Sequence, residues 1–254
     1  MFRRIPHDRY LTILGGIFAI VFTLSAIGPH DRKDWLLENA LVVLGIAILL
    51  AFRRRMHFSR ISYTLIFVFL CIHELGAHYV YSDVPYDEWF LALTGRTLNS
   101  FLGWQRNNFD RFVHLSYGLL LAYPIREIFL RVADVRGFWG YFLPLDLTMS
   151  SSMLYELIEW AAAECFGGEL GQAYLGTQGD VWDAHKDMAL ASVGALLAMV
   201  ITALLNARLQ HDFAQEWNDS LRVKHRAPLG EDEIARLRGA QSPNGGRIER
   251  SAGE

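Results

Sequence analysis

The residues best suited to chemistry in this sequence lie in residues 176–188, GTQGDVWDAHKDM, where an apolar run over 188–205 begins. Ionisable side chains crowd this stretch: Asp180, Asp183, Lys186 and Asp187. If a helix begins near Asp180, the three aspartates stand at i, i+3 and i+7 and share one face. Three carboxylates on one face repel one another. The sequence therefore predicts a cation, a proton or a hydrogen-bond network that compensates them.

Three further pairs of ionisable residues have helical spacing: Glu74 with His78, Asp110 with His114, and Glu156 with Glu159. Each pair projects from one face of its helix, and a charge that faces lipid near mid-bilayer costs ~3 kcal/mol or more. We therefore expect these faces to turn inward and meet, as carboxylate and imidazole groups do in the metal centres of helix bundles. Neither the Glu-x-x-His spacing of the di-iron class nor the zinc motif with two histidines four apart is present.

Membrane-spanning helices are the elements that must position these residues. Hydrophobic residues make up 52% of the 254 residues and fall in long blocks, which is typical of a bilayer protein. We predict an all-α polytopic transmembrane bundle over 1–207, with about six spans: 10–27, 35–52, 61–81, 110–130, a span within 139–166 that starts at Pro144, and 182–207. A short interfacial helix is expected around 86–93. Residues 208–254 are predicted to be a cytoplasmic polar tail, largely disordered at its end.

Lysine and arginine are distributed unevenly over the expected loops. Nine lie in 1–9, 53–60 and 131–137, whereas the alternate loops hold four. By the positive-inside rule both termini are cytoplasmic, which places the ionisable pairs and the aspartates at the outer leaflet. The total of 24 basic against 27 acidic residues is nearly balanced, so no nucleic-acid footprint is present.

Simpler structural roles account for several of these residues as well. Asp110 and Asp180 are suitable N-caps, and Asp183 is favoured by the dipole of a first helical turn. The glutamates can form structural ion pairs with Arg111 or Lys186. The histidines can be hydrogen-bonded interior residues.

Four segments carry a resemblance to a known family: HELGAHYVYSDVPYD, RNNFDRFVHLSYGLLLAYPIRE, SSMLYELIEW and YLGTQGDVWDAHKDM. Over roughly residues 60–200 the chain resembles the YjdF-type family of bacterial inner-membrane proteins. The resemblance implies a multi-pass location in the bacterial inner membrane and no particular reaction.

A looser similarity is to VanZ-like membrane proteins, which are linked with glycopeptide antibiotic tolerance. Its pattern falls here on Asp110, Arg111, His114 and Gly118, then Glu156 and Glu159, then Asp183 and Asp187 before Gly194. The match departs at Tyr117, which stands one residue too early, and at Asp187, where that pattern has asparagine.

The function remains open between classes, and whether the protein is an enzyme is not decided. The first hypothesis is a membrane enzyme that acts on a lipid or lipid-linked substrate through a divalent metal (zinc, manganese or iron) or through acid–base chemistry. The candidate metal ligands are His78, His114, Glu156, Asp183 and Asp187. Supporting catalytic roles fall to Glu74, Glu159 and Asp180, with Arg111 or Lys186 holding an anionic head group. The alternatives are a proton- or cation-coupled transporter and a structural membrane subunit; the oligomeric state is open.

Overall fold

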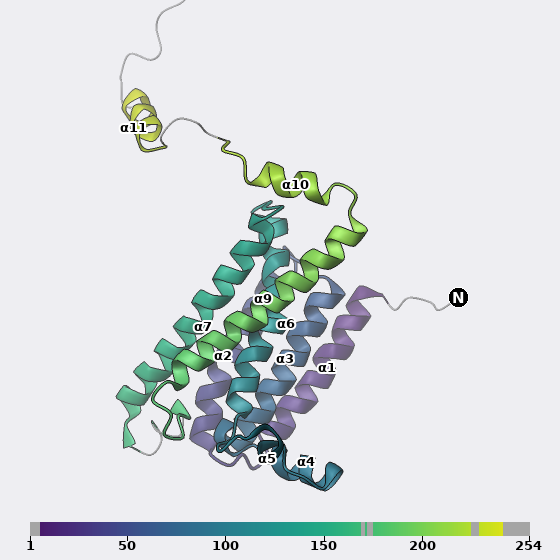
Figure 1. Ribbon diagram of the computed structural model, residues 1–254, viewed down its shortest axis with the longest axis vertical. Helices are drawn as coiled ribbons and strands as arrows, with labels where there is room; N and C mark the ends of the chain where they lie inside the picture. The colour runs from purple at the N-terminus through teal and green to yellow at the C-terminus, as the bar shows by residue number, and fades with distance from the viewer. Residues whose placement is uncertain (1–5, 169–170, 172–174, 225–228, 241–254) are drawn as a thin grey trace, which may run out of the picture.

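The computed structural model describes residues 6–168, 171, 175–224 and 229–240, and these residues form a helix bundle (Figure 1). The elements in chain order are α1 His7–Ser25, α2 Arg32–Phe52, α3 Arg60–Tyr79, the 3-10 turn η1 Tyr81–Asp83, α4 Tyr86–Thr94, α5 Leu98–Leu102, α6 Phe109–Val132, α7 Trp139–Phe166, α9 Asp183–Leu209, α10 Phe213–Ser220 and α11 Leu229–Ala240. The described residues contain no β-strand, which confirms the all-α prediction.

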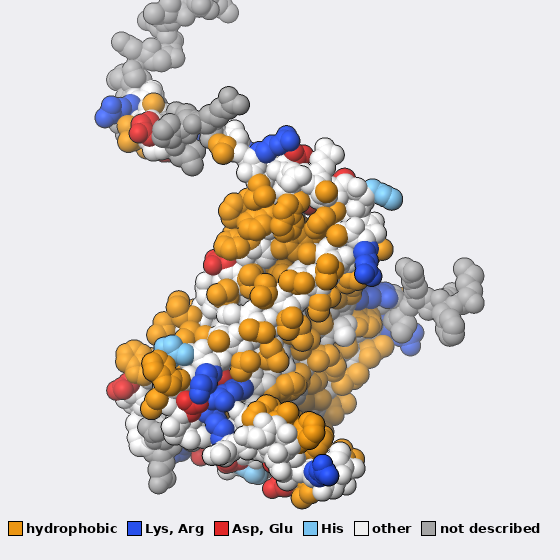
Figure 2. Space-filling view, in the orientation of Figure 1, with side chains coloured by type: hydrophobic (Ala, Val, Ile, Leu, Met, Phe, Trp, Pro, Cys, Tyr) orange, Lys and Arg blue, Asp and Glu red, His pale blue; other side chains and the backbone are white. Residues whose placement is uncertain are grey.

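Four helices are long and apolar enough to cross a bilayer, namely α1, α2, α3 and α9. A span needs ~20 apolar residues, and these helices have 19, 21, 20 and 27 residues. The helices α6 and α7 are also long, at 24 and 28 residues, but polar and ionisable side chains interrupt their apolar runs. Hydrophobic side chains cover much of the flank of the bundle in Figure 2, and charged side chains gather towards its ends.

Helix α6 lies at the centre of the bundle, where it packs against α3, α7 and α9. Small residues let α6 and α9 approach closely, as is common between membrane helices. A Cβ added to Gly118 would lie 1.9 Å from the carbonyl oxygen of Ala191, and one added to Gly194 would lie 2.2 Å from that of Leu115. The crossing of α6 and α9 therefore depends on glycine at both positions.

The two ends of the bundle carry different short helices (Figure 1). We call them the α4–α5 end and the α10 end. At the α10 end, Phe213 and Trp217 of α10 pack against Tyr141 of α7. The backbone N–H of Phe138 donates to the Ser220 hydroxyl at 2.9 Å. The segment after α9 thus begins with a helix docked on the bundle, while the end of the expected tail, 241–254, lies outside the described residues.

The predicted start of the fifth span at Pro144 is wrong, whereas the predicted span 182–207 begins within one residue of α9. The condition that this helix begins near Asp180 is not met. Helix α7 begins at Trp139 and contains Pro144 in its interior, although an interior proline removes one backbone hydrogen bond and its ring crowds the carbonyl of residue i−4. Helix α9 begins at Asp183, so Asp180 precedes it and does not share its face with Asp187. The Asp180 carboxylate accepts the backbone N–H of Trp182 at 3.1 Å, which holds this residue in the turn before the helix.

Candidate functional site

His114 is the centre of a buried group of ionisable side chains at the α4–α5 end. Helix α6 presents His114 one turn after Asp110, with 3.5 Å between His114 Nε2 and Asp110 Oδ1. Helix α7 brings Glu156 Oε1 to 3.4 Å from the same nitrogen. His114 is 7% exposed, so two carboxyl groups meet one imidazole in a site with little access to water.

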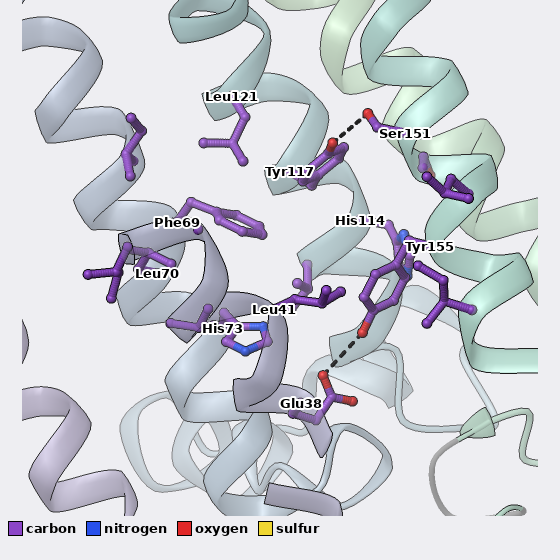
Figure 3. Close-up of a pocket in the computed structure, with 18 of the residues that line it drawn as sticks. Glu38, Leu41, Phe69, Leu70, His73, His114, Tyr117, Leu121, Ser151 and Tyr155 are labelled. Atoms are coloured by element: carbon purple, nitrogen blue, oxygen red, sulfur yellow. Dashed lines mark hydrogen bonds between the residues drawn. The ribbon is translucent and has the colours of Figure 1, made fainter. Parts of the chain in front are cut away.

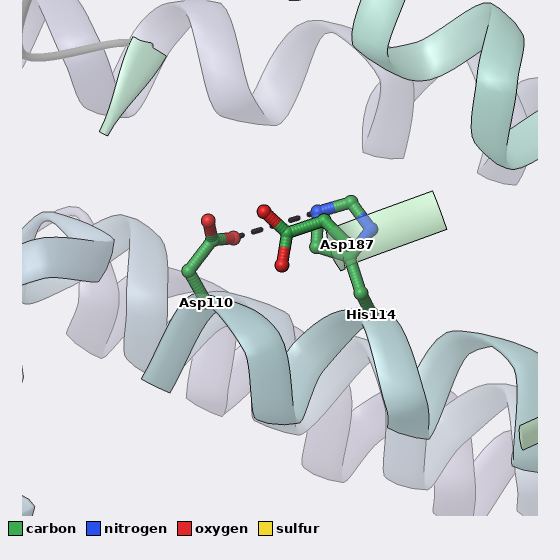
Figure 4. A group of neighbouring side chains, drawn as sticks. All are labelled: Asp110, His114 and Asp187. Atoms are coloured by element: carbon green, nitrogen blue, oxygen red, sulfur yellow. Dashed lines mark ion pairs between the residues drawn. The ribbon is translucent and has the colours of Figure 1, made fainter. Parts of the chain in front are cut away.

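Asp187 completes this group from α9 (Figure 4). One ligand atom each from Asp110, His114 and Asp187 lies within 4.8 Å of the others. Asp187 is 2% exposed, and its Oδ1 has no hydrogen-bond partner among the described residues. We call Asp110, His114, Glu156 and Asp187 the His114 cluster. Its mixed oxygen and nitrogen donors suit zinc, manganese or iron.

The remaining aspartates before and at the start of α9 belong to a separate ion-pair network. Arg106 makes a bidentate contact with Asp183, with Nη1 to Oδ1 at 2.5 Å and Nη2 to Oδ2 at 3.2 Å. Arg111 Nη2 lies 2.5 Å from Asp180 Oδ2 and 3.2 Å from Asp183 Oδ1. Lys186 Nζ lies 2.5 Å from Asp180 Oδ2. The compensation predicted for the aspartates thus comes from arginine and lysine at Asp180 and Asp183, whereas Asp187 lies with His114.

The network keeps Asp180 ionised. The Lys186 ammonium, together with the Trp182 backbone N–H and Arg111, holds the pKa of the Asp180 carboxyl well below its usual range. The structure thus places Asp183 against arginines, away from the ligand role predicted for it. It places Arg111 and Lys186 against aspartates, away from the predicted head-group role.

Glu74 and His78 lie on the side of α3 that faces α1. The Ser25 hydroxyl of α1 donates to the Glu74 carboxylate, and the indole N–H of Trp35 donates to the same hydroxyl at 3.2 Å. His78 Nδ1 lies 2.9 Å from the carbonyl oxygen of Ser25. These two candidates therefore join α1, α2 and α3 to one another and are not brought to the His114 cluster.

A cavity of about 540 Å³ lies between α2, α3, α6 and α7. Asp110, His114 and Glu159 line it at the α4–α5 end. Figure 3 shows side chains from these helices pointing into it, with the Tyr155 hydroxyl donating to Glu38 at 3.1 Å. Asp34 and His73 also line this end, and the Tyr81 hydroxyl contacts His73 Nδ1 at 2.5 Å.

Three of these residues were not singled out from the sequence: Asp34, Glu38 and Arg106. Asp34 and Glu38 are four residues apart at the start of the second span, which is the spacing that identified the other pairs. The same criterion applied to that span would have found them. Arg106 lies in a connector without periodicity, and no local signal pointed to its contact with Asp183.

The bundle, its apolar flank and its long spanning helices define a multi-pass membrane protein with buried ionisable groups at one end. The family model described as "Predicted membrane protein (DUF2238)" matches residues 10–208, and the chain belongs to this family. It is also 36% identical over 190 residues to "Inner membrane protein YjdF" of Escherichia coli (strain K12), an alignment that covers 74% of this chain and 87% of that protein. The resemblance to the YjdF-type family is thereby confirmed. No solved structure matches the chain.

Proposed function

We propose that this protein is a membrane enzyme that acts on a lipid or lipid-linked substrate, with the His114 cluster as its reactive centre. One observation carries the proposal. Asp110 and His114 line the same cavity whose other end is lined by apolar side chains, so one amphiphilic molecule can reach the cluster with its head while its chain stays among apolar groups. Ligand pockets of 300–1,000 Å³ are typical of small-molecule sites.

The residues of the cluster have distinct proposed roles. His114, Asp110 and Asp187 would hold a divalent ion such as zinc, because one ligand atom from each lies within 4.8 Å of the others. When bound, such an ion would supply Lewis-acid activation for hydrolysis or group transfer. Glu156, 3.4 Å from His114 Nε2, acts as a further ligand or as a general base. Glu159, which lines the cavity, acts as an acid or base towards the substrate.

The proposal includes a topology. Six spans (α1, α2, α3, α6, α7 and α9) and cytoplasmic termini place the His114 cluster in the outer leaflet of a bacterial inner membrane. Support comes from the lysine and arginine bias of the loops and from the printed name of the Escherichia coli relative. A coupled transporter has less support, because the cavity is lined by apolar side chains towards the α10 end and a cation path requires polar groups throughout.

Metal content tests the reactive centre directly. Protein purified in detergent is analysed by mass spectrometry for bound metal, beside His114→Ala, Asp187→Asn and Asp183→Asn. We expect about one equivalent in the wild type, loss in the first two variants, and retention in Asp183→Asn, because Asp183 pairs with Arg106 and Arg111. Metal at the same trace level in all four folded proteins would refute the metal centre.

A further inference from the structure

The cavity carries carboxyl groups at one end, the hydroxyl groups of Tyr117, Ser151 and Ser152 at mid-length, and apolar side chains beyond them. Four carboxyl groups line it at the α4–α5 end, those of Asp34, Glu38, Asp110 and Glu159. Towards the α10 end the lining is apolar and comes from Ile46, Leu49, Phe58, Leu121, Ile125 and Ile128. Such a lining suits a molecule with a polar head and a hydrocarbon chain; Figure 3 labels Glu38 and His73 near the polar end and Leu121 farther along the cavity.

The cavity is long enough to take a hydrocarbon chain. The lining residues of α6 run from Asp110 to Ile128, which is about 27 Å of helix. Its volume of about 540 Å³ lies within the 300–1,000 Å³ that is typical of small-molecule sites, so a hydrocarbon chain can lie along this length.

The polar end of the cavity contains buried polar atoms that lack hydrogen-bond partners among the described residues. Asp34 is 1% exposed, and neither of its carboxylate oxygens has a hydrogen-bond partner among the described residues. His73 is also buried, and its Nε2 has no partner in the same part of the chain. Buried polar atoms are normally hydrogen-bonded, so each exception calls for an explanation such as a ligand. Carboxylate oxygens accept hydrogen bonds and need a donor.

The arginine and lysine side chains near this end are paired with aspartates outside the cavity lining. Among the described residues that line the cavity none is lysine or arginine. Arg106, Arg111 and Lys186 are paired with Asp180 and Asp183. A phosphate or carboxylate head would meet four carboxyl groups with no arginine or lysine to hold it, whereas hydroxyl and ammonium groups would supply the missing donors.

We propose that the substrate is an amphiphile whose head carries hydroxyl or ammonium donors in place of a phosphate, with Asp34 binding that head. This inference rests on the proposed function and specifies its substrate. The chain lies along Phe69 and Leu121, and the head lies between Asp34 and the His114 cluster.

Photo-crosslinking in phosphatidylcholine vesicles tests this proposal. The probe is a long-chain monoalkylglycerol with a diazirine in its chain, and the labelled peptides are mapped by mass spectrometry. We expect label near Phe69 and Leu121, reduced roughly tenfold in Leu121→Trp, which fills the apolar part of the cavity. Leu119→Trp is the matched control, because Leu119 lies on the same helix and is 36% exposed; it should leave labelling unchanged.

Competition then identifies the head. Excess monoacylglycerol and sphingosine should suppress labelling, and lysophosphatidic acid should suppress it far less. In Asp34→Asn, the difference in suppression between lysophosphatidic acid and the other two lipids should become smaller. Stronger competition by lysophosphatidic acid would overturn the inference and leave the proposed function with an anionic substrate. Equal labelling of the wild type and Leu121→Trp would overturn the inference as well, while the metal measurement, which uses no lipid, would still decide on the His114 cluster.

Discussion

The ionisable residues at the α4–α5 end differ in whether a partner is present. Asp180 and Asp183 are neutralised by Arg106, Arg111 and Lys186, whereas Asp187 keeps an oxygen without a partner among the described residues. A paired carboxylate contributes to stability, but a buried unpaired one is costly and is a feature of functional sites. The first network therefore neutralises the carboxylates before and at the start of α9, whereas Asp187 one turn later is left to His114.

The pairing of Asp180 has a consequence for the pH dependence of stability. Its pKa is lower in the folded protein than the usual value, chiefly because of Lys186. Such a group stabilises the fold fully above its unfolded pKa of about 4, and this contribution is lost as the pH falls towards the folded pKa. Asp180→Asn should therefore lower the melting temperature at pH 7 and pH 5 equally, and by less at pH 3.

Thermal unfolding in detergent at these three pH values measures the effect. Asp134→Asn is the matched control, because Asp134 pairs with Arg136 at an exposed site, with side chains 80% and 66% exposed. Exposed pairs contribute little, so this variant should follow the wild type throughout. A gap between wild type and Asp180→Asn that widens as the pH falls would contradict the pairing.

Residue types and spacing located the candidate site, and they did not determine which residues meet. His114, Glu156 and Asp187 were singled out because ionisable residues in apolar helices are rare and costly. The partner of Asp183 was not predictable, because Arg106 reaches it from a connector held by side-chain hydrogen bonds, such as that from Asn99 Nδ2 to the Arg106 carbonyl oxygen at 3.2 Å. Contacts of this kind depend on tertiary structure.

At the scale of elements, the crossing of α6 and α9 brings Asp110 and His114 to Asp187. Gly118→Ala would place a Cβ 1.9 Å from the Ala191 carbonyl oxygen, and backbone atoms cannot move aside cheaply. Overpacking typically costs about 1–3 kcal/mol. We expect Gly118→Ala to lower the melting temperature and to reduce bound metal, because the two helices that supply the ligands are pushed apart.

Gly16→Ala is the control for this experiment, since Gly16 lies in α1 and an added Cβ would meet nothing within 4 Å. That variant should keep both the melting temperature and the metal content of the wild type. Equal behaviour of the two alanine variants would show that the close approach of α6 and α9 is not what assembles the cluster.

The helices were more predictable than their contacts. Hydrophobic length determines a span, so the expected span 35–52 ends at the same residue as α2. The expected short helix 86–93 ends within one residue of α4. The start of α7 was wrongly predicted at Pro144. The helix continues through this proline despite the loss of one hydrogen bond. The faces of α2 and α7 that meet across the cavity are set by packing between residues far apart in sequence, such as Tyr155 and Glu38.

At the scale of the whole molecule, the proposed topology places the polar end of the cavity and the α4–α5 end on the outer side of the membrane. Labelling of two loops from outside distinguishes a topology with six membrane spans from one with four. If α6 and α7 both cross the membrane, the loop between them, which contains Arg136, is cytoplasmic, whereas Ser100 of α5 is outside. If only α1, α2, α3 and α9 cross, both positions are outside.

Cysteine labelling in spheroplasts decides between these arrangements. The native thiols Cys71 and Cys165 are replaced by alanine, and Ser100→Cys or Arg136→Cys is added; both positions are exposed. With a membrane-impermeant maleimide we expect Ser100→Cys to react in intact spheroplasts and Arg136→Cys to react only after lysis. Reaction of both before lysis would mean that α6 does not cross. Protection of Ser100→Cys with reaction of Arg136→Cys would invert the orientation and move the His114 cluster to the cytoplasmic leaflet, where its substrate would have to be sought.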